Sequence, residues 1–290
     1  MFGRVTQRRD SGVKKGINRW SLPADWSIRQ CMERAKEAGF EGIELALDET
    51  GELSLESDEQ QVKAVRKMAA DIGLELKSLA TGLFWKYSLT ANDPDVREKA
   101  RSVVVKALDV AQWLGADTVL VVPGVVSAPF ATSERTSYAD AWDRAIEALQ
   151  ELALEAEQRQ VSIGIENVWN KFLLSPVEMR EFIDTIDSQY VGAYFDVGNV
   201  LLYGFPEDWI RVLGPRIKKV HFKDFRTAVG TLAGFVNLLE GDVNWPEVMA
   251  AFDEIGYTDY AYTELSPYRY HSDALIDDIS RAMDRILGIE

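Results

Sequence analysis

Four side chains that could bind a metal ion each end, or closely follow, a short apolar run of the sequence. They are Glu166, Asp196, His221 and Glu264, and their runs read SIGIEN, YVGAYFDVGN, KKVHFKD and YAYTEL. Three carboxylates and one imidazole form a fairly hard ligand set, which favours Mn²⁺ or Mg²⁺, with Co²⁺, Fe²⁺ and Zn²⁺ as alternatives. Because 30, 25 and 43 residues separate successive members, only a fold that gathers distant strand ends could unite them.

Each of these residues also has a structural interpretation on its own. A histidine on an apolar strand, such as His221, is commonly a hydrogen-bonded core residue. Asp196 could cap a turn with Gly198 and Asn199, and an acid at a strand end often caps the next helix. Acidic side chains are nevertheless rarely buried without a partner. Four such groups on four consecutive strands therefore favour one shared metal site.

Strand-like and helix-like segments alternate along the chain. The predicted strands are 16–22, 42–47, 75–81, 118–124, 162–167, 190–197, 217–222 and 260–265, all nearly continuous in hydrophobicity. Amphipathic helical spacing covers 27–38, 59–72, 95–114 and 138–158. Gly39, Gly73, Gly115 and Gly256 are predicted helix ends, and Ser175-Pro176 and Phe205-Pro206 are predicted helix starts.

Eight strands that alternate with helices, without a linker, predict a single-domain (β/α)8 TIM barrel. We expect residues 16–290 to form it and residues 1–15 to be an N-terminal leader that could be disordered. A doubly wound open sheet is the alternative, although the chain has no G-x-G-x-x-G turn and no P-loop. The stretch 226–245 lacks clear periodicity and is a candidate active-site loop.

The composition limits the class of protein. The chain has 290 residues, 47% of them hydrophobic, which is enough for one large core. Its single cysteine, Cys31, excludes an intrachain disulfide and a cysteine-based zinc site, and predicts a reducing, cytoplasmic location. The only histidines are His221 and His271, which excludes a site of three imidazoles.

Charge and hydropathy limit the partners. A net charge of −15 argues against nucleic acid and anionic membranes as partners. No apolar run approaches the roughly 20 residues of a membrane span. The basic N-terminal stretch has no apolar core, so it does not read as a secretory signal. We expect a small-molecule partner and a homo-oligomer, either a dimer or a tetramer.

The chain resembles the xylose isomerase-like TIM-barrel superfamily of sugar and sugar-phosphate isomerases and epimerases, including the ketose 3-epimerases. The matching motifs, over roughly residues 16–287, are GIEN (164–167), FDVGN (195–199), VHFKD (220–224), LEGDVNW (239–245) and TEL (263–265). The resemblance implies that Glu166, Asp196, His221 and Glu264 bind one divalent ion, with Mn²⁺ first. It also implies that Glu166 and Glu264 are the acid/base pair.

This chemistry is reasonable on general grounds. A proton next to a carbonyl is very weakly acidic, and a bound cation can stabilise the enediolate that its removal creates. One carboxylate can remove the proton and a second, on the other face, can return it with inversion. Return at the adjacent carbon would instead interconvert an aldose and a ketose.

Three polar residues are candidates for substrate binding. Asn199 stands where ketose 3-epimerases often have histidine, a pattern that resembles the sugar-phosphate branch. Lys223 follows His221 by two residues and could bind a substrate oxygen or phosphate, or form a salt bridge to Glu44 or Glu240. Arg226 opens the long loop and could hold an anionic group.

Three tryptophans lie at or just beyond predicted strand ends. Trp20, Trp85 and Trp169 could stack on a sugar, or could pack the rim or an oligomer contact. Glu240 and Asp242 could support the site from behind, or could cap the helix that starts near Trp245-Pro246.

Other activities share such a barrel. A DNA-repair endonuclease would need more histidines and a basic groove than this chain has. An inosose or dehydroshikimate dehydratase would begin with the same proton abstraction and then lose a hydroxyl group, so sequence does not separate it from an epimerase. A binding protein without catalytic activity would retain no stoichiometric metal.

Overall fold

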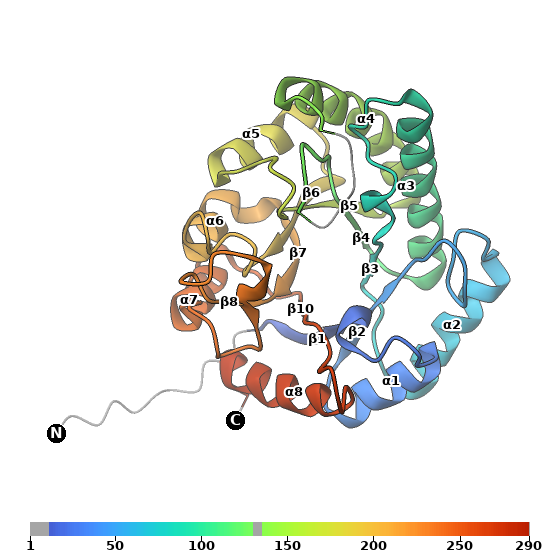
Figure 1. Cartoon of the computed structure of the whole chain (residues 1–290). Helices are drawn as coiled ribbons and strands as arrows, with labels where there is room; N and C mark the ends of the chain where they lie inside the picture. The colour runs from blue at the N-terminus through green and yellow to red at the C-terminus, as the bar shows by residue number, and fades with distance from the viewer. Residues whose placement is uncertain (1–11, 130–134, 290) are drawn as a thin grey trace.

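Eight parallel strands, each followed by a helix, close into a barrel in the computed structural model, which describes residues 12–129 and 135–289 (Figure 1). The strands lie in the order β1-β10-β7-β6-β5-β4-β3-β2 around the barrel. They are β1 Lys14–Asn18, β2 Gly42–Ala46, β3 Ser78–Ala80, β4 Thr118–Val121, β5 Ser162–Glu166, β6 Val191–Asp196, β7 Ile217–Phe222 and β10 Tyr260–Thr263. The predicted (β/α)8 barrel is confirmed, and the open doubly wound sheet is excluded because the sheet closes.

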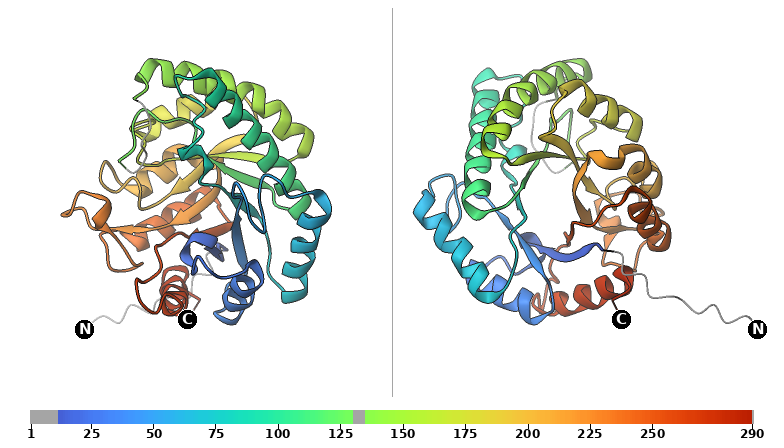
Figure 2. Two further views of the ribbon diagram at one scale, coloured as in Figure 1. Left: turned by 45° about the vertical axis from the view of Figure 1, so that its right-hand side comes forward. Right: turned by 180° about the vertical axis from the view of Figure 1, so that it is seen from behind.

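The helices form a ring outside the strands, seen from the front in Figure 1 and from behind in the right-hand view of Figure 2. They are α1 Ile28–Glu37, α2 Glu59–Ile72, α3 Pro94–Leu114, α4 Tyr138–Arg159, α5 Pro176–Ile186, α6 Pro206–Leu213, α7 Trp245–Ile255 and α8 Ala274–Leu287. Within the described part of the chain, none of the helices has the length and apolar character of a membrane span.

The helix ends follow local sequence. Gly73, Gly115 and Gly256 end α2, α3 and α7 with φ of 83°, 80° and 70°, a left-handed conformation that glycine adopts without strain. Proline occupies the first turn of α5 and of α6, where its missing N–H is not needed. The connections that begin at these glycines are short, and each leads into a strand parallel to its neighbours.

Three predicted segments have different limits in the structure. β1 begins at Lys14 and ends at Asn18, because the Asn18 side chain accepts a hydrogen bond from Trp20 N and opens a 3₁₀ turn. The predicted leader therefore includes two residues of β1, and its residues 1–11 lie outside the described part. β3 is only three residues long, since of the predicted strand 75–81 only Ser78–Ala80 is regular strand.

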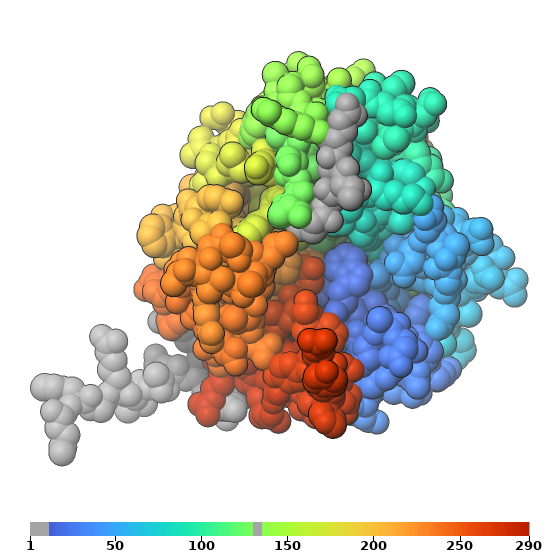
Figure 3. Space-filling model, viewed as in Figure 1, coloured from blue at the N-terminus to red at the C-terminus, as the bar shows by residue number. Residues whose placement is uncertain are grey.

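The stretch 226–245 contains a short hairpin that its lack of periodicity did not predict. β9, Phe235–Val236, pairs antiparallel with β8, Asp224–Phe225. Two-residue strands carry too few residues for a periodic pattern. In Figures 1 and 3 this orange segment stands in front of the barrel, at the carboxyl ends of the strands.

The opposite end of the barrel contains a different cluster of charges. Lys219 on β7 is buried, and its Nζ donates to Asp117 Oδ1 at 2.6 Å and to Asp259 Oδ2 at 2.5 Å. These ion pairs tie β7 to the residues that precede β4 and β10. They occupy the end that usually contributes to stability in such barrels.

Candidate metal centre and active site

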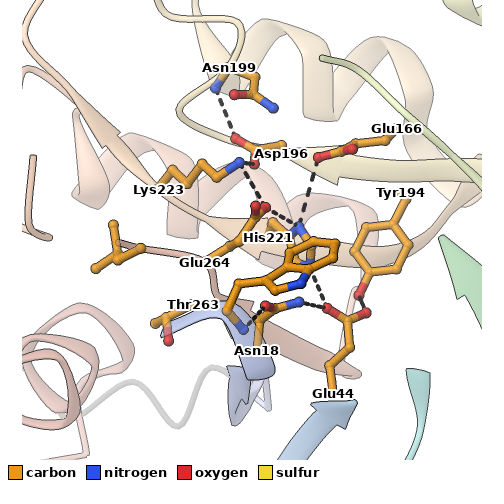
Figure 4. A network of polar contacts seen from close by, with 12 residues as sticks. Asn18, Glu44, Glu166, Tyr194, Asp196, Asn199, His221, Lys223, Thr263 and Glu264 are labelled. Carbon is orange, nitrogen blue, oxygen red and sulfur yellow. Dashed lines mark hydrogen bonds and ion pairs between the residues drawn. The ribbon is translucent and has the colours of Figure 1, made fainter. Parts of the chain in front are cut away.

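Glu166, Asp196, His221 and Glu264 meet at the carboxyl ends of four adjacent barrel strands (Figure 4). Glu166 and Asp196 end β5 and β6, His221 lies in β7, and Glu264 follows β10. One ligand atom from each side chain lies within 4.8 Å of those of the other three. The structure thus brings together the four residues that the sequence predicted as ligands.

The register of the sheet produces this convergence. Asp196 lies directly opposite His221 on the neighbouring strand, and His221 lies opposite Tyr262, two residues before Glu264. On the other side, Glu166 lies opposite Tyr194, two residues before Asp196. Residues two apart on a strand point to the same face, so the four side chains all point into the barrel.

Three of the four side chains present a buried atom without a hydrogen bond in the described part of the chain: Asp196 Oδ2, His221 Nδ1 and Glu264 Oε2. Their contacts are ion pairs, with Lys223 Nζ for the two carboxylates and with Glu264 Oε2 for His221 Nδ1, so a bound cation could replace the lysine as their partner. The donor set of carboxylate oxygens and one imidazole nitrogen fits a divalent cation.

Asp196 is held in place by two asparagines. Asn167 Oδ1 accepts from Asp196 N at 2.9 Å, and Asn167 Nδ2 donates to Asp196 O at 2.8 Å. Asn199 N donates to Asp196 Oδ1 at 2.8 Å, so Asp196 does cap the turn that its sequence suggested. The cap uses only one carboxylate oxygen and leaves Oδ2 directed at the cluster.

Lys223 lies between the carboxylates of this cluster. Its Nζ is 3.0 Å from Asp196 Oδ2 and 2.7 Å from Glu264 Oε2. The salt bridges expected to Glu44 or Glu240 are not the ones that Lys223 makes: Glu44 is bound to His221, and Glu240 lies 3.8 Å from Arg226. Burial works to lower the pKa of Lys223, but the charges of the surrounding carboxylates raise it.

The two glutamates have very different acidities. Burial, aided by the charge of Glu264, raises the pKa of Glu166 to about 7. Burial also works to raise the pKa of Glu264, but the charge of Lys223 and the contact with His221 lower it to about 2. Without a bound cation, one carboxyl is therefore poised to hold a proton near neutral pH while the other is ionised.

A cavity of about 240 Å³ lies over the cluster. It is lined by Glu166, Glu264, Lys223 and Asn199 and by the predicted aromatic residues Trp20, Trp85 and Trp169. Trp169 is fixed by ring contacts with Phe225 and Phe235 at 5.4 and 5.3 Å, and its Nε1 donates to Asn199 O at 2.9 Å. The loop hairpin therefore shapes this cavity through Phe235.

Asn199 lines this cavity and also a neighbouring one of about 650 Å³. Its Nδ2 already donates to Asn167 O at 3.0 Å. The second cavity shares Val168, Trp169 and Leu232 with the first and is mainly apolar. Asn199 thus lies between the four candidate ligands and the larger, apolar cavity.

Three other candidates lie away from the cavity. The half-exposed Arg226 donates from Nε to Glu240 O at 2.9 Å and is not among the described residues that line the cavity. Asp242 accepts from Thr227 N and Oγ1 at 2.7 and 2.6 Å, so it braces the loop. Neither Glu240 nor Asp242 caps α7, whose N-cap residue is Asn244.

Two polar residues support the site in roles that the sequence did not predict. Asn167 holds Asp196, and Glu44, in the middle of the apolar strand GIELA, contacts His221. A charged residue inside a buried strand was the available signal for Glu44, since acids are rarely buried without a partner.

Comparisons with known proteins agree with this fold. The "Putative L-ribulose-5-phosphate 3-epimerase SgbU" of Escherichia coli (strain K12) is 26% identical over 249 residues, 83% of this chain and 85% of that one. An "Inosose dehydratase" of Bacillus thuringiensis (strain Al Hakam) is 23% identical over 217 residues, 72% and 67% of the two chains. A crystal structure of D-psicose 3-epimerase in the presence of D-fructose has the same fold, with a TM-score of 0.78, 21% identity and coverage of 95% and 100%.

The family model described as xylose isomerase-like TIM barrel matches residues 32–286, which is most of the chain and includes the whole cluster. The chain therefore belongs to the xylose isomerase-like TIM-barrel family.

Proposed function

We propose that this protein is a divalent-metal-dependent isomerase or epimerase of a ketose or ketose phosphate. The observation that carries the proposal is the convergence of four ligand side chains, three of them with unsatisfied buried atoms, beneath a cavity lined by tryptophans. The epimerase name of a relative that aligns with 83% of the chain supports the reaction class.

Asp196 and His221 would hold the cation, and Glu166 and Glu264 would complete its ligands. Mn²⁺ suits this oxygen-rich set best, with Mg²⁺, Co²⁺ or Zn²⁺ as alternatives. When bound, such an ion polarises the substrate carbonyl and stabilises the charge that develops on its oxygen. The two glutamates would then carry the proton chemistry.

The positions and acidities of the two glutamates support an acid/base pair. β6 and β7 lie between β5 and β10, so Glu166 and Glu264 approach the cluster from opposite sides. Ligation of a cation would keep both glutamates ionised near neutral pH, as a general base requires. Removal of the proton by one glutamate and its return by the other would invert the carbon.

The cavity suits a small polyhydroxy ketone. Its 240 Å³ is below the roughly 300 to 1,000 Å³ of sites for drug-sized ligands. Trp20, Trp85 and Trp169 offer aromatic faces to a sugar ring or chain. Among the described residues that line the cavity, Lys223 is the positively charged side chain. We propose that it binds a substrate oxygen or a phosphate.

A dehydratase is the second candidate, because a relative named inosose dehydratase aligns with 72% of the chain. It would begin with the same proton abstraction and then expel a hydroxyl group from the neighbouring carbon. Both activities need the metal and a carboxylate base, so the four candidate ligands suit either activity.

The test is a screen of free ketoses, ketose phosphates and inososes in D₂O with Mn²⁺, followed by NMR and mass spectrometry. Incorporation of one deuterium at carbon without loss of water supports an isomerase or epimerase. Loss of water supports the dehydratase. If no substrate exchanges a proton although the protein holds its metal, the proposal is wrong.

A further inference from the structure

Glu44 lies on one side of the His221 ring, and the other three candidate ligands, Glu166, Asp196 and Glu264, lie on the other side (Figure 4). It projects from β2 into the barrel and is fully buried, with an exposed fraction of 0%. Its Oε2 is 2.7 Å from His221 Nε2, whereas Glu166 Oε1 and Glu264 Oε2 lie 3.9 and 2.9 Å from the other ring nitrogen, Nδ1. The imidazole thus bridges two groups of carboxylates.

Both oxygens of Glu44 are occupied by donors. Oε2 accepts from His221 and from Asn18 Nδ2, the latter at 2.5 Å. Oε1 accepts from Ser78 Oγ at 2.5 Å and from the hydroxyl of Tyr194. These partners come from β7, β1, β3 and β6, so Glu44 is fixed from across the whole barrel and is not available as a ligand.

This arrangement determines which nitrogen of His221 can bind a cation. A neutral imidazole carries one N–H, and the hydrogen bond made by one nitrogen sets the role of the other. With Nε2–H donating to Glu44, the lone pair resides on Nδ1, the atom that faces Glu166, Asp196 and Glu264. Without a cation, either tautomer places a lone pair against a carboxylate, Glu264 at Nδ1 or Glu44 at Nε2. A cation bound among Glu166, Asp196 and Glu264 would remove this repulsion at Nδ1 only, which favours the Nε2–H tautomer.

We infer that Glu44 is a positioning residue for the metal site, which holds His221 in the Nε2–H tautomer and directs Nδ1 at the cation. The inference rests on the proposed function for the presence of the metal. A carboxylate behind a ligating histidine also makes the imidazole a stronger donor, and loss of such a partner typically weakens metal binding by about 10- to 100-fold.

A purely structural role is the competing explanation, because Glu44 also ties together Asn18, Ser78 and Tyr194. Two variants separate the explanations. Glu44→Gln keeps the volume but removes the charge that faces His221. Tyr194→Phe removes a hydrogen bond from the other oxygen, Oε1, and leaves the contact with His221 in place. Urea denaturation of both metal-free variants measures the structural contribution.

We expect Glu44→Gln to bind Mn²⁺ at least about tenfold more weakly than wild type in titration calorimetry, whereas Tyr194→Phe changes the affinity less than about threefold. If folded Glu44→Gln binds as tightly as wild type, the role of Glu44 is structural and the inference is wrong. If wild type itself binds no divalent ion, the inference and the proposed metal dependence both fail.

A second measurement needs no variant. The chain has only two histidines, so ¹⁵N-histidine NMR of the wild-type protein loaded with Zn²⁺ resolves His221 from His271. A protonated Nε2 with a metal-bound Nδ1 supports the role of Glu44. Coordination through Nε2, or a proton on Nδ1, overturns it even if Glu44→Gln does not fold.

Discussion

The ammonium group of Lys223 lies 2.7 Å from Oε2 of Glu264, one of the four predicted metal ligands. The position from which Lys223 could bind substrate is thus also one from which it competes with a cation. A positive charge this close to two ligand carboxylates neutralises them when no ion is bound and repels an ion that arrives.

Replacement of this lysine should therefore tighten metal binding. We expect Lys223→Met to bind Mn²⁺ about tenfold or more tightly than wild type, as measured by titration calorimetry, and to turn over substrate poorly. The metal-free variant should lose about 3–5 kcal/mol of unfolding free energy, because the buried carboxylates of Asp196 and Glu264 lose the ammonium group that they share.

Arg226→Met is the matched control, since it removes a cation at the same end of the barrel but outside the cavity. It should change neither quantity appreciably. An unchanged affinity in Lys223→Met would show that the ammonium group leaves both carboxylates when the ion binds.

Metal binding should release protons, and their number should depend on pH. Burial favours a neutral His221, but the charge of Glu44 and the bonds to Glu166 and Glu264 raise its pKa well above the ordinary value. A protonated His221 must release its proton from Nδ1 when the ion binds there. Glu166, with a pKa of about 7, releases another below that pH.

The dissociation constant should thus fall as the pH rises, and the proton of Glu166 should make this fall steeper below pH 7 than above it, by about a further tenfold per pH unit. Calorimetry in buffers of different ionisation enthalpy counts the protons. In Glu166→Gln the pH dependence of the dissociation constant should be equally shallow above and below pH 7, because the glutamine side chain does not titrate. The same pH dependence above and below pH 7 in wild type would contradict the raised pKa of Glu166.

Glu166→Gln and Glu264→Gln should each lower kcat by at least about 100-fold, because each removes one of the two proton carriers. The reaction is followed in D₂O, where both the product and the exchange of substrate hydrogen are measured. Glu240→Gln is the control, an exposed change at the same end of the barrel. A wild-type rate in either Glu166→Gln or Glu264→Gln would contradict the two-carboxylate mechanism.

A second buried lysine on β7 should behave differently from Lys223. Lys219→Met breaks the ion pairs with Asp117 and Asp259 at the opposite end of the barrel. Because both acids are partly exposed, we expect a loss of about 1–2 kcal/mol in unfolding free energy by urea denaturation. The Mn²⁺ affinity should stay at the wild-type value, and a lower one would show that the two ends of the barrel are coupled.

The sequence by itself determined the barrel and its four candidate ligands. Buried parallel strands read as continuous apolar runs, and glycines and prolines mark the helix ends, so local signals were sufficient for the alternation of elements. The rule that strand ends of a barrel share one face then placed Glu166, Asp196, His221 and Glu264 together.

Only the tertiary structure decided which other side chains reach the cluster. Glu44 and His221 are 177 residues apart, and their contact depends on the diameter and register of the closed barrel. For the same reason Lys223 could not be assigned to Asp196 and Glu264, nor Arg226 to the loop, until the direction of each side chain was known. Periodicity fixes the face of a strand on which a residue lies, but partners across the barrel depend on distances that only the closed sheet sets.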